Sequence, residues 1–195
     1  MEVPTLHERT QKLFDKLVGD LPHALIIDGP TGIGVTYVAK ALSKSMDSPA
    51  IVIEPKKSVN GQMVIDHKEG NIVIDDIRQL YEQTRTALPG SLVYILDTGE
   101  RSMTVAAQNA FLKLLEEPRD GLHFIITTHQ PDQLLPTISS RSQKLTLLPI
   151  TDSQTQSIID ELSISDPSKK ARLSFVGRGL PALIHRLAQD DKSYE

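Results

Sequence analysis

"HALIIDGPTGIGVTYVAKALSKSM", residues 23–46, contains three kinds of segment in a fixed order. Residues 23–28 are a short apolar run that ends at a glycine turn, which predicts a buried strand. Residues 29–34 hold three glycines, and residues 36–46 have the apolar spacing of a helix. Strand, glycine-rich loop and helix in this order form the context in which a phosphate-binding loop occurs.

The loop departs from the phosphate-binding pattern G-x-x-x-x-G-K-[ST] at one position. Gly29, Gly34 and Thr36 match it, but Val35 stands where the lysine belongs. Glycines, including Gly32, let backbone N–H groups approach a phosphate, and the threonine hydroxyl would hold Mg²⁺. Loss of the lysine removes the positive charge that stabilises phosphoryl transfer. The segment is therefore a working ATP site, the remnant of one, or a tight turn that never bound phosphate.

The rest of the chain predicts an α/β fold followed by a helical segment. Apolar runs predict strands at residues 49–54, 91–97, 122–128 and 143–149. Helical periodicity predicts helices at residues 5–18, within residues 72–88 and at 104–117, with a short helix and turn at residues 131–142. The helix within residues 72–88 is expected to start at Asp75 or Asp76. Alternating strands and helices imply a parallel sheet with helices on both faces. Residues 58–71 predict a loop or small hairpin, and three short helices follow Pro149.

Composition narrows the function classes. The 195 residues carry a net charge of -4, whereas a protein that wraps nucleic acid by itself is usually basic. The sequence has no cysteine, which excludes disulfides and thiolate-ligated metal, and its six histidines lack metal-ligand spacing. It also has neither an apolar run long enough for a membrane span nor a signal-peptide pattern at the start. We therefore expect a cytoplasmic protein without membrane contact.

Asp97 is a candidate magnesium ligand because it ends the predicted strand at residues 91–97. An Asp at the carboxyl end of a parallel strand beside the glycine loop would face bound Mg²⁺. Hydrolysing enzymes of this kind often place a Glu directly after that Asp, but Thr98 follows here. A simple turn-capping role for Asp97 remains the alternative.

Two charged features lie further along the chain. Arg141, in "TISSRSQKL", comes directly before a predicted strand, where it would be an arginine finger for a neighbouring subunit or a partner in a surface salt bridge. Glu116 and Glu117 end a predicted helix, where negative charge is mildly unfavourable with the helix dipole. The two glutamates either contact a partner or form a solvated helix end.

The ordered set of segments resembles the AAA+ subunits of the bacterial DNA polymerase III clamp loader. The matching stretches are "HALIIDGPTGIGVTYVAKAL", "IVIDDIRQL", "VYILDTGERSMTVAAQNAFLKLLEEP", "FIITTHQPDQLLPTISSRSQ" and "GRGLPALIHRLA". The pair "MTVAAQNAFLKLLEEP" and "LLPTISSRS" is far more specific than the glycine loop alone. Within the family, the altered positions make the chain most like the delta-prime subunit.

The resemblance implies roles for individual residues. Arg141 matches the arginine of the family's Ser-Arg-Cys motif, which acts in trans on ATP held by the neighbouring subunit; Ser142 replaces the cysteine. Thr128, with Thr127 as alternative, falls at the sensor 1 position. Pro181 stands where active members carry a sensor 2 arginine, with Arg178 close by but out of register. Val35, Thr98 and Pro181 are thus three separate departures from an active ATPase.

The resemblance also implies an organisation and partners. We expect an AAA+ core with a degenerate loop at residues 1–148 and a helical lid at residues 149–195. The four-cysteine zinc module of many members has no counterpart here, so zinc is not expected, and the C-terminal collar domain of full-length members is absent from this sequence. The expected partners are gamma/tau-type ATPase subunits, the clamp-opening delta subunit and, through the complex, the sliding clamp and primed DNA.

The resulting hypothesis is a non-hydrolysing delta-prime-type subunit of the polymerase III holoenzyme that assists clamp loading. Its own nucleotide site, which would comprise Gly29, Gly32, Gly34, Thr36, Asp97 and Thr128, is expected to be weak or empty of ATP and Mg²⁺. The alternative is a gamma/tau-like ATPase that keeps weak ATP binding and hydrolysis. A third possibility is a stand-alone interaction module that kept the fold and lost the complex.

Overall fold

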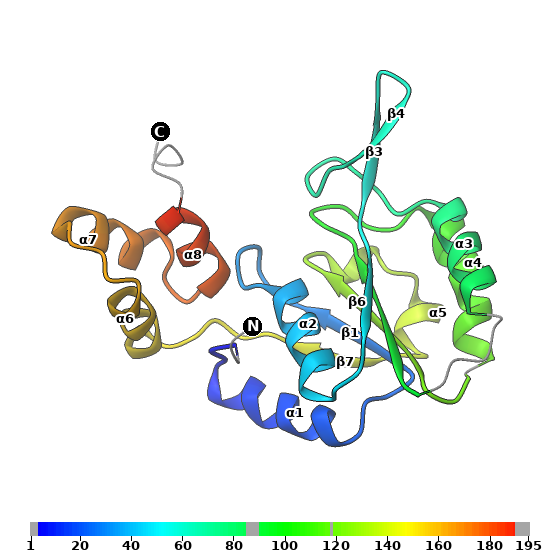
Figure 1. Cartoon of the computed structure of the whole chain (residues 1–195), viewed down its shortest axis with the longest axis horizontal. Helices are drawn as coiled ribbons and strands as arrows, with labels where there is room; N and C mark the ends of the chain where they lie inside the picture. The colour runs from blue at the N-terminus through cyan, green and yellow to red at the C-terminus, as the bar shows by residue number, and fades with distance from the viewer. Residues whose placement is uncertain (1–3, 85–89, 118, 190–195) are drawn as a thin grey trace.

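A five-stranded sheet forms the centre of the molecule. The structure is a computed structural model that describes residues 4–84, 90–117 and 119–189. All neighbouring strands are parallel, in the order β2-β5-β6-β1-β7 (Figure 1). The strands are β1 (Ala24–Asp28), β2 (Ala50–Ile53), β5 (Leu92–Asp97), β6 (Leu122–Thr128) and β7 (Gln143–Thr146). The predicted parallel α/β fold is confirmed.

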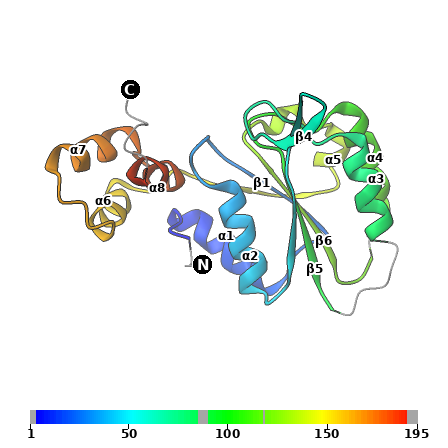
Figure 2. The same cartoon turned by 45° about the horizontal axis from the view of Figure 1, so that its top comes forward.

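Helices bury both faces of this sheet, as its apolar strands require. They are α1 (Glu8–Gly19) and α2 (Val35–Ser45) on one face, and α3 (Ile74–Gln83) and α4 (Val105–Glu116) on the other (Figure 2). Neighbouring residues of a strand point to opposite faces. In β1, Leu25 and Ile27 therefore pack with α1 and α2, whereas Ala24 and Ile26 pack with α3 and α4.

Helix α3 begins one or two residues earlier than the sequence indicates. Asp75 or Asp76 was the expected start, but the helix begins at Ile74 with Val73 as its N-cap residue. The Asp76 carboxylate accepts a hydrogen bond from the Val73 N–H at 2.9 Å and pairs with Lys56 at 3.0 Å. An acid in the third helical position can bond back to the N–H of the N-cap residue, as Asp76 does here, so the acidic pair marks the first turn and not the boundary. The C-terminal end of the predicted helix, residues 85–88, and the expected stop of the next one, Pro118, lie outside the described residues.

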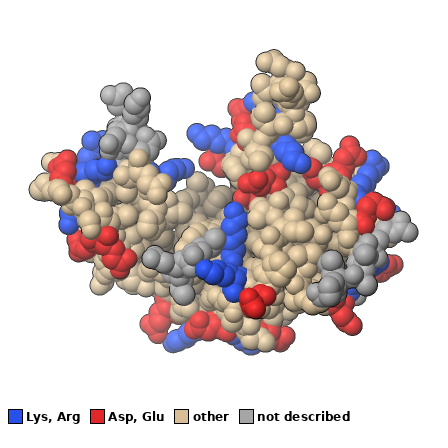
Figure 3. Space-filling model, viewed as in Figure 1, with Lys and Arg blue, Asp and Glu red and all other residues tan. Residues whose placement is uncertain are grey.

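The polar segment between β2 and α3 is a hairpin, one of the two forms expected for it. Strands β3 (Lys56–Val59) and β4 (Gln62–Ile65) pair antiparallel through Asn60 and Gly61, whose φ angles are 51° and 80°. Two successive positive φ angles are typical of the tight hairpin turn that favours Asn-Gly. The hairpin projects away from the sheet (Figures 1 and 3). Its exposed apolar side chains include Val59 and Met63.

The three helices after Pro149 form a unit with a core of its own. They are α6 (Asp152–Glu161), α7 (Pro167–Val176) and α8 (Pro181–Gln189). The buried residues of this core include Ile159, Leu173 and Ile184. The division into residues 1–148 and 149–195, and a lid role for the second part, remain predictions. Within the described part of the chain, no helix combines the length and the apolar character needed to cross a membrane.

Two short helical turns connect β6 to β7 and are held by one buried side chain. They are a 3₁₀ turn at Pro131–Gln133 and helix α5 (Pro136–Ser139). Gln108 of α4 is 2% exposed, and its amide donates to the carbonyls of Met103 and Gln133 and accepts from the Leu135 N–H at 2.7 Å. This amide joins the start of α5 to the N-terminal part of α4.

Candidate functional site: a nucleotide loop without its lysine, and a remote arginine

The glycine loop joins β1 to α2 in the geometry of a phosphate cradle. Gly32 and Gly34 have φ angles of +89° and +98°, in the left-handed region that side chains disfavour. Gly34 is the N-cap residue of α2, so it offers no side chain to the first N–H groups of that helix. Those N–H groups and the helix dipole are what an anion would meet.

The same glycines are required by packing against helix α8. A Cβ atom on Gly32 would lie 2.9 Å from the Leu183 Cβ, and one on Gly34 would lie 3.2 Å from the Ala182 Cβ. The Leu183 N–H also donates to the Gly32 carbonyl at 2.9 Å. A Cβ on Gly29 would lie 3.0 Å from Ile33. The glycines therefore have a structural reason to be present whether or not a phosphate binds.

A cavity of about 310 Å³ lies over the loop and brings part of the predicted site together. It is lined by Thr31, Gly32, Gly34, Val35, Thr36, Tyr37, His67, Asp97, Gly99, Glu100, His129, Ala182, Leu183 and Arg186. Four predicted site residues, Gly32, Gly34, Thr36 and Asp97, are among them. Gly29 and Thr128 do not line this cavity, and Arg141 is not part of it.

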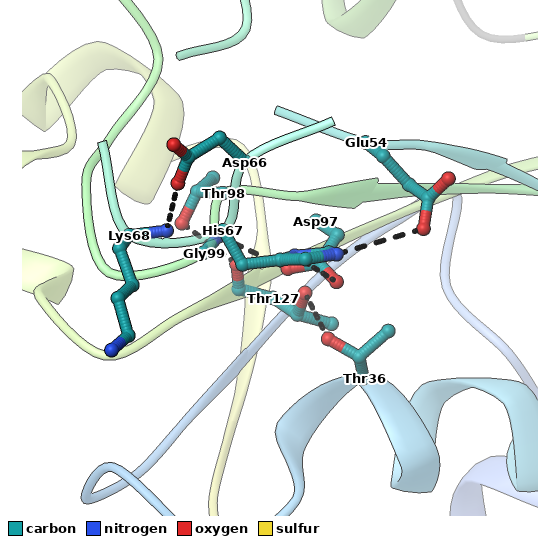
Figure 4. A network of polar contacts seen from close by, with 9 residues as sticks. All are labelled: Thr36, Glu54, Asp66, His67, Lys68, Asp97, Thr98, Gly99 and Thr127. Carbon is teal, nitrogen blue, oxygen red and sulfur yellow. Dashed lines mark hydrogen bonds and ion pairs between the residues drawn. The ribbon is translucent and has the colours of Figure 1, made fainter. Parts of the chain in front are cut away.

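The polar groups that would hold Mg²⁺ are engaged with other protein groups (Figure 4). The Thr36 Oγ1 lies 3.1 Å from the Thr127 Oγ1. One oxygen of Asp97 accepts the Gly99 N–H at 3.0 Å, and the other lies 3.6 Å from the His67 Nδ1. The opposite ring nitrogen of His67 lies 3.7 Å from Glu54. A histidine between two carboxylates thus stands beside Asp97.

Thr127 and Thr128 differ in the direction of their side chains. Both are fully buried. The Thr127 hydroxyl faces Thr36 at the start of α2, whereas the Thr128 Oγ1 accepts the Gln130 N–H at 3.0 Å. Strand residues alternate between faces, so only one of the two can point toward the loop. The contact with Thr36 is made by Thr127, the alternative considered for sensor 1.

Thr98 lies at the carboxyl end of β5, and its hydroxyl is not placed to orient a water molecule. Its hydroxyl donates to the Thr127 carbonyl at 2.9 Å, and the residue is fully buried. Val35 is 3% exposed and belongs to the apolar cluster beneath α2. Neither residue supplies the charge that hydrolysis needs.

Arg186 is a cavity residue that the sequence interpretation missed. It is an exposed residue of α8 and lines the space over the loop. Helical spacing gives a signal for it, because residues four apart share a helix face, and Ala182, four positions earlier, packs on Gly34. Arg178 is committed elsewhere, since its guanidinium donates twice to Asp152, at 2.7 and 2.6 Å. Pro181 is the first residue of α8.

Arg141 lies at the opposite end of the sheet from the loop. It precedes β7, which runs parallel to β1 with Gln143 opposite Leu25 and Thr146 opposite Asp28. The start of β7 is therefore three residues, about 10 Å, short of the end of β1. The guanidinium donates to the Thr137 carbonyl at 3.1 Å and pairs with Glu116 at 3.1 Å, while the side chain stays 40% exposed.

Comparisons with known proteins agree on one family. The family described as DNA polymerase III, delta subunit, matches residues 7–151. The DNA polymerase III subunit delta' of Bacillus subtilis (strain 168) is 32% identical over 182 residues, which are 86% of this chain and 54% of that protein. The subunit gamma/tau of Mycobacterium bovis is 34% identical over 138 residues, 64% of this chain and 24% of that protein.

A solved structure confirms the fold at lower identity. The Thermotoga maritima RuvB Holliday junction branch migration motor has a TM-score of 0.68 and 17% identity, and the match covers 93% of this chain and 60% of that one. The chain spans about a quarter of its gamma/tau relatives and about half of its delta' relatives. With its AAA+ fold and a family match over residues 7–151, this chain belongs to the DNA polymerase III clamp-loader family that includes the delta' and gamma/tau subunits.

Proposed function

We propose that this chain is a delta-prime-type clamp-loader subunit that does not hydrolyse ATP and that supplies Arg141 to the ATP site of a neighbouring gamma/tau-type subunit. In this role it assists loading of a sliding clamp onto primed DNA, together with a clamp-opening delta subunit. Residues 149–195 act as a lid that is fixed to the loop through α8. The observation that carries the proposal is the separation of Arg141 from the chain's own glycine loop.

That separation excludes service to the chain's own loop. The loop follows the carboxyl end of β1, whereas Arg141 precedes the amino end of the adjacent parallel strand. Any phosphate that Arg141 contacts therefore belongs to another molecule. An exposed guanidinium is suited to this, because its fork of N–H donors matches the oxygens of a phosphate.

The chain's own loop supports the non-hydrolysing part of the proposal. Hydrolysis depends on positioned charge around the transferred phosphoryl group. Here Val35 is buried in the core, Thr98 is hydrogen-bonded within the sheet, and Asp97 faces His67. No step of ATP hydrolysis can be assigned to these residues.

The test is ATPase activity of the complex reconstituted with its gamma/tau-type partner. Arg141→Ala should slow hydrolysis at the adjoining site by about 10³-fold, the scale of an arginine finger, while circular dichroism of the chain is unchanged. Arg178→Ala is the matched control, because it removes an exposed arginine that is paired with Asp152 in the α6–α8 unit. Equal rates for wild type and Arg141→Ala would remove the trans role.

A second candidate is a gamma/tau-like subunit that retains weak ATP binding and hydrolysis. The cavity over the loop favours it, because Thr36 and Arg186 both line that space. Calorimetric titration of the isolated chain with ATP and Mg²⁺ separates the two functions. Micromolar, Mg²⁺-dependent binding with turnover would favour the second, and absence of turnover the first.

A further inference from the structure

Helix α4 ends beside Arg141, and its last residue is in direct contact with that side chain. Glu116 Oε1 lies 3.1 Å from Arg141 Nη2. The two residues are 25 positions apart and come from different elements, the C-terminal end of α4 and the turn after α5. At its other end, α4 is joined to the start of α5 by the Gln108 amide, which bonds to Gln133 and Leu135.

We infer that Glu116 is a positioning residue for Arg141, which it holds in the orientation that a partner's phosphate meets. This inference rests on the proposed trans role of Arg141. A guanidinium has five N–H donors. The Thr137 carbonyl binds Nη1 and the Glu116 carboxylate binds Nη2, so the group is anchored at two of its corners. Among the described residues, these contacts leave the other donors available to an anion from outside.

We expect Glu116 to act by restricting the rotamers of the Arg141 side chain before the partner binds. A free arginine side chain has many rotamers, and fixing it at the moment of association opposes binding of the transition state. An arginine already anchored loses less freedom when the partner arrives. Loss of the Glu116 contact should therefore lower the partner's rate of ATP hydrolysis and leave its affinity for ATP unchanged.

The contribution of the Arg141–Glu116 ion pair to folding stability does not explain its presence. Both side chains are substantially exposed, 40% for Arg141 and 52% for Glu116, and exposed ion pairs contribute little to folding. A carboxylate at the C-terminal end of a helix is also mildly unfavourable with the helix dipole. Glu116 occupies that position nonetheless, with its carboxylate directed at Arg141.

The matched control is the neighbouring glutamate. Glu117 is the C-cap residue of the same helix and is also exposed, but no contact places its carboxylate on Arg141. Glu116→Gln and Glu117→Gln remove the same charge from adjacent positions and preserve side-chain volume. A difference between them reports the contact with Arg141 and not the general charge of this surface.

The experiment is a double-mutant cycle on the reconstituted complex, with ATP hydrolysis by the gamma/tau-type partner as readout. Glu116→Gln should lower kcat by about twofold to fivefold, the range for an exposed ion pair, with KM for ATP unchanged. Glu117→Gln should match wild type. In an Arg141→Ala background, Glu116→Gln should add no further loss, because the group that it positions is gone.

Each other outcome overturns the inference in a distinguishable way. If Arg141→Ala slows hydrolysis and Glu116→Gln does not, the positioning role fails while the proposed function stands. If neither slows it, both fail together. A loss from Glu116→Gln that persists in the Arg141→Ala background would assign Glu116 a separate role. A gain in rate would make Glu116 a restraint on Arg141.

Discussion

Replacement of Gly32 with alanine measures how firmly helix α8 is packed on the glycine loop. Gly32 has a φ of +89°, and an added Cβ would lie 2.9 Å from the Leu183 Cβ. Left-handed backbone costs a residue with a Cβ about 1–2 kcal/mol. Forcing an extra methyl group into a packed contact costs about 1–3 kcal/mol more. Because Leu183 meets it with a Cβ held by the helix and not with a flexible chain end, we expect a loss of about 2–5 kcal/mol.

Urea denaturation gives the free energy of unfolding, and amide exchange at Leu183 reports the local contact, since its N–H donates to the Gly32 carbonyl. Gly90→Ala is the control, because Gly90 has a φ of +94° and open space around the added Cβ. It should lose only the backbone part, about 1–2 kcal/mol. Equal losses for the two variants, with unchanged exchange at Leu183, would refute the packing of α8 on the loop.

Three further outcomes are expected. Val35→Lys should lower stability by about 1–3 kcal/mol in a thermal melt, because a longer, charged side chain replaces a residue that is 3% exposed, and ATP turnover should not appear. Gln108→Leu should cost about 3 kcal/mol in urea denaturation, since three backbone groups each lose a hydrogen bond of about 1 kcal/mol. The Arg178 guanidinium holds the pKa of Asp152 below its usual range, so this pair stabilises the fold above the ordinary carboxyl pKa and ceases to as the pH falls through the lowered value. Proton titration by NMR should show the lowered pKa in wild type and an ordinary one in Arg178→Ala.

The centre of the parallel sheet was predictable because strands such as β1 and β5 are buried along their whole length, which gives continuous apolar runs. Each of the five apolar runs identified in the sequence contains a strand, although β2 and β7, at the two edges of the sheet, are mostly exposed or half-buried. The start of α3 was placed too late, because a carboxylate at the third helical position resembles a cap residue in sequence. Local chemistry of this kind fixes a helix start only to within a turn.

The surroundings of Asp97 were not predictable from the chain order. His67 reaches Asp97 only because the β3–β4 hairpin returns beside β5, and Gly99 allows that approach, since a Cβ there would lie 2.4 Å from the His67 carbonyl. The choice between Thr127 and Thr128 likewise depends on strand register, which a single residue reverses. The surroundings of Asp97 and the directions of Thr127 and Thr128 are both set by contacts between segments distant in sequence.

The residues retained in this chain differ in what they imply about function. Gly32 and Gly34 match a phosphate loop, but packing against Leu183 and Ala182 already requires them, so their presence does not favour nucleotide binding over a structural turn. Arg141 is different, because its charge is exposed and its contacts contribute little to folding. A residue that the fold does not need is better explained by something outside the fold. The position of Arg141 at the far end of the sheet from the chain's own loop therefore supports a role toward a partner more strongly than the loop supports a role of its own.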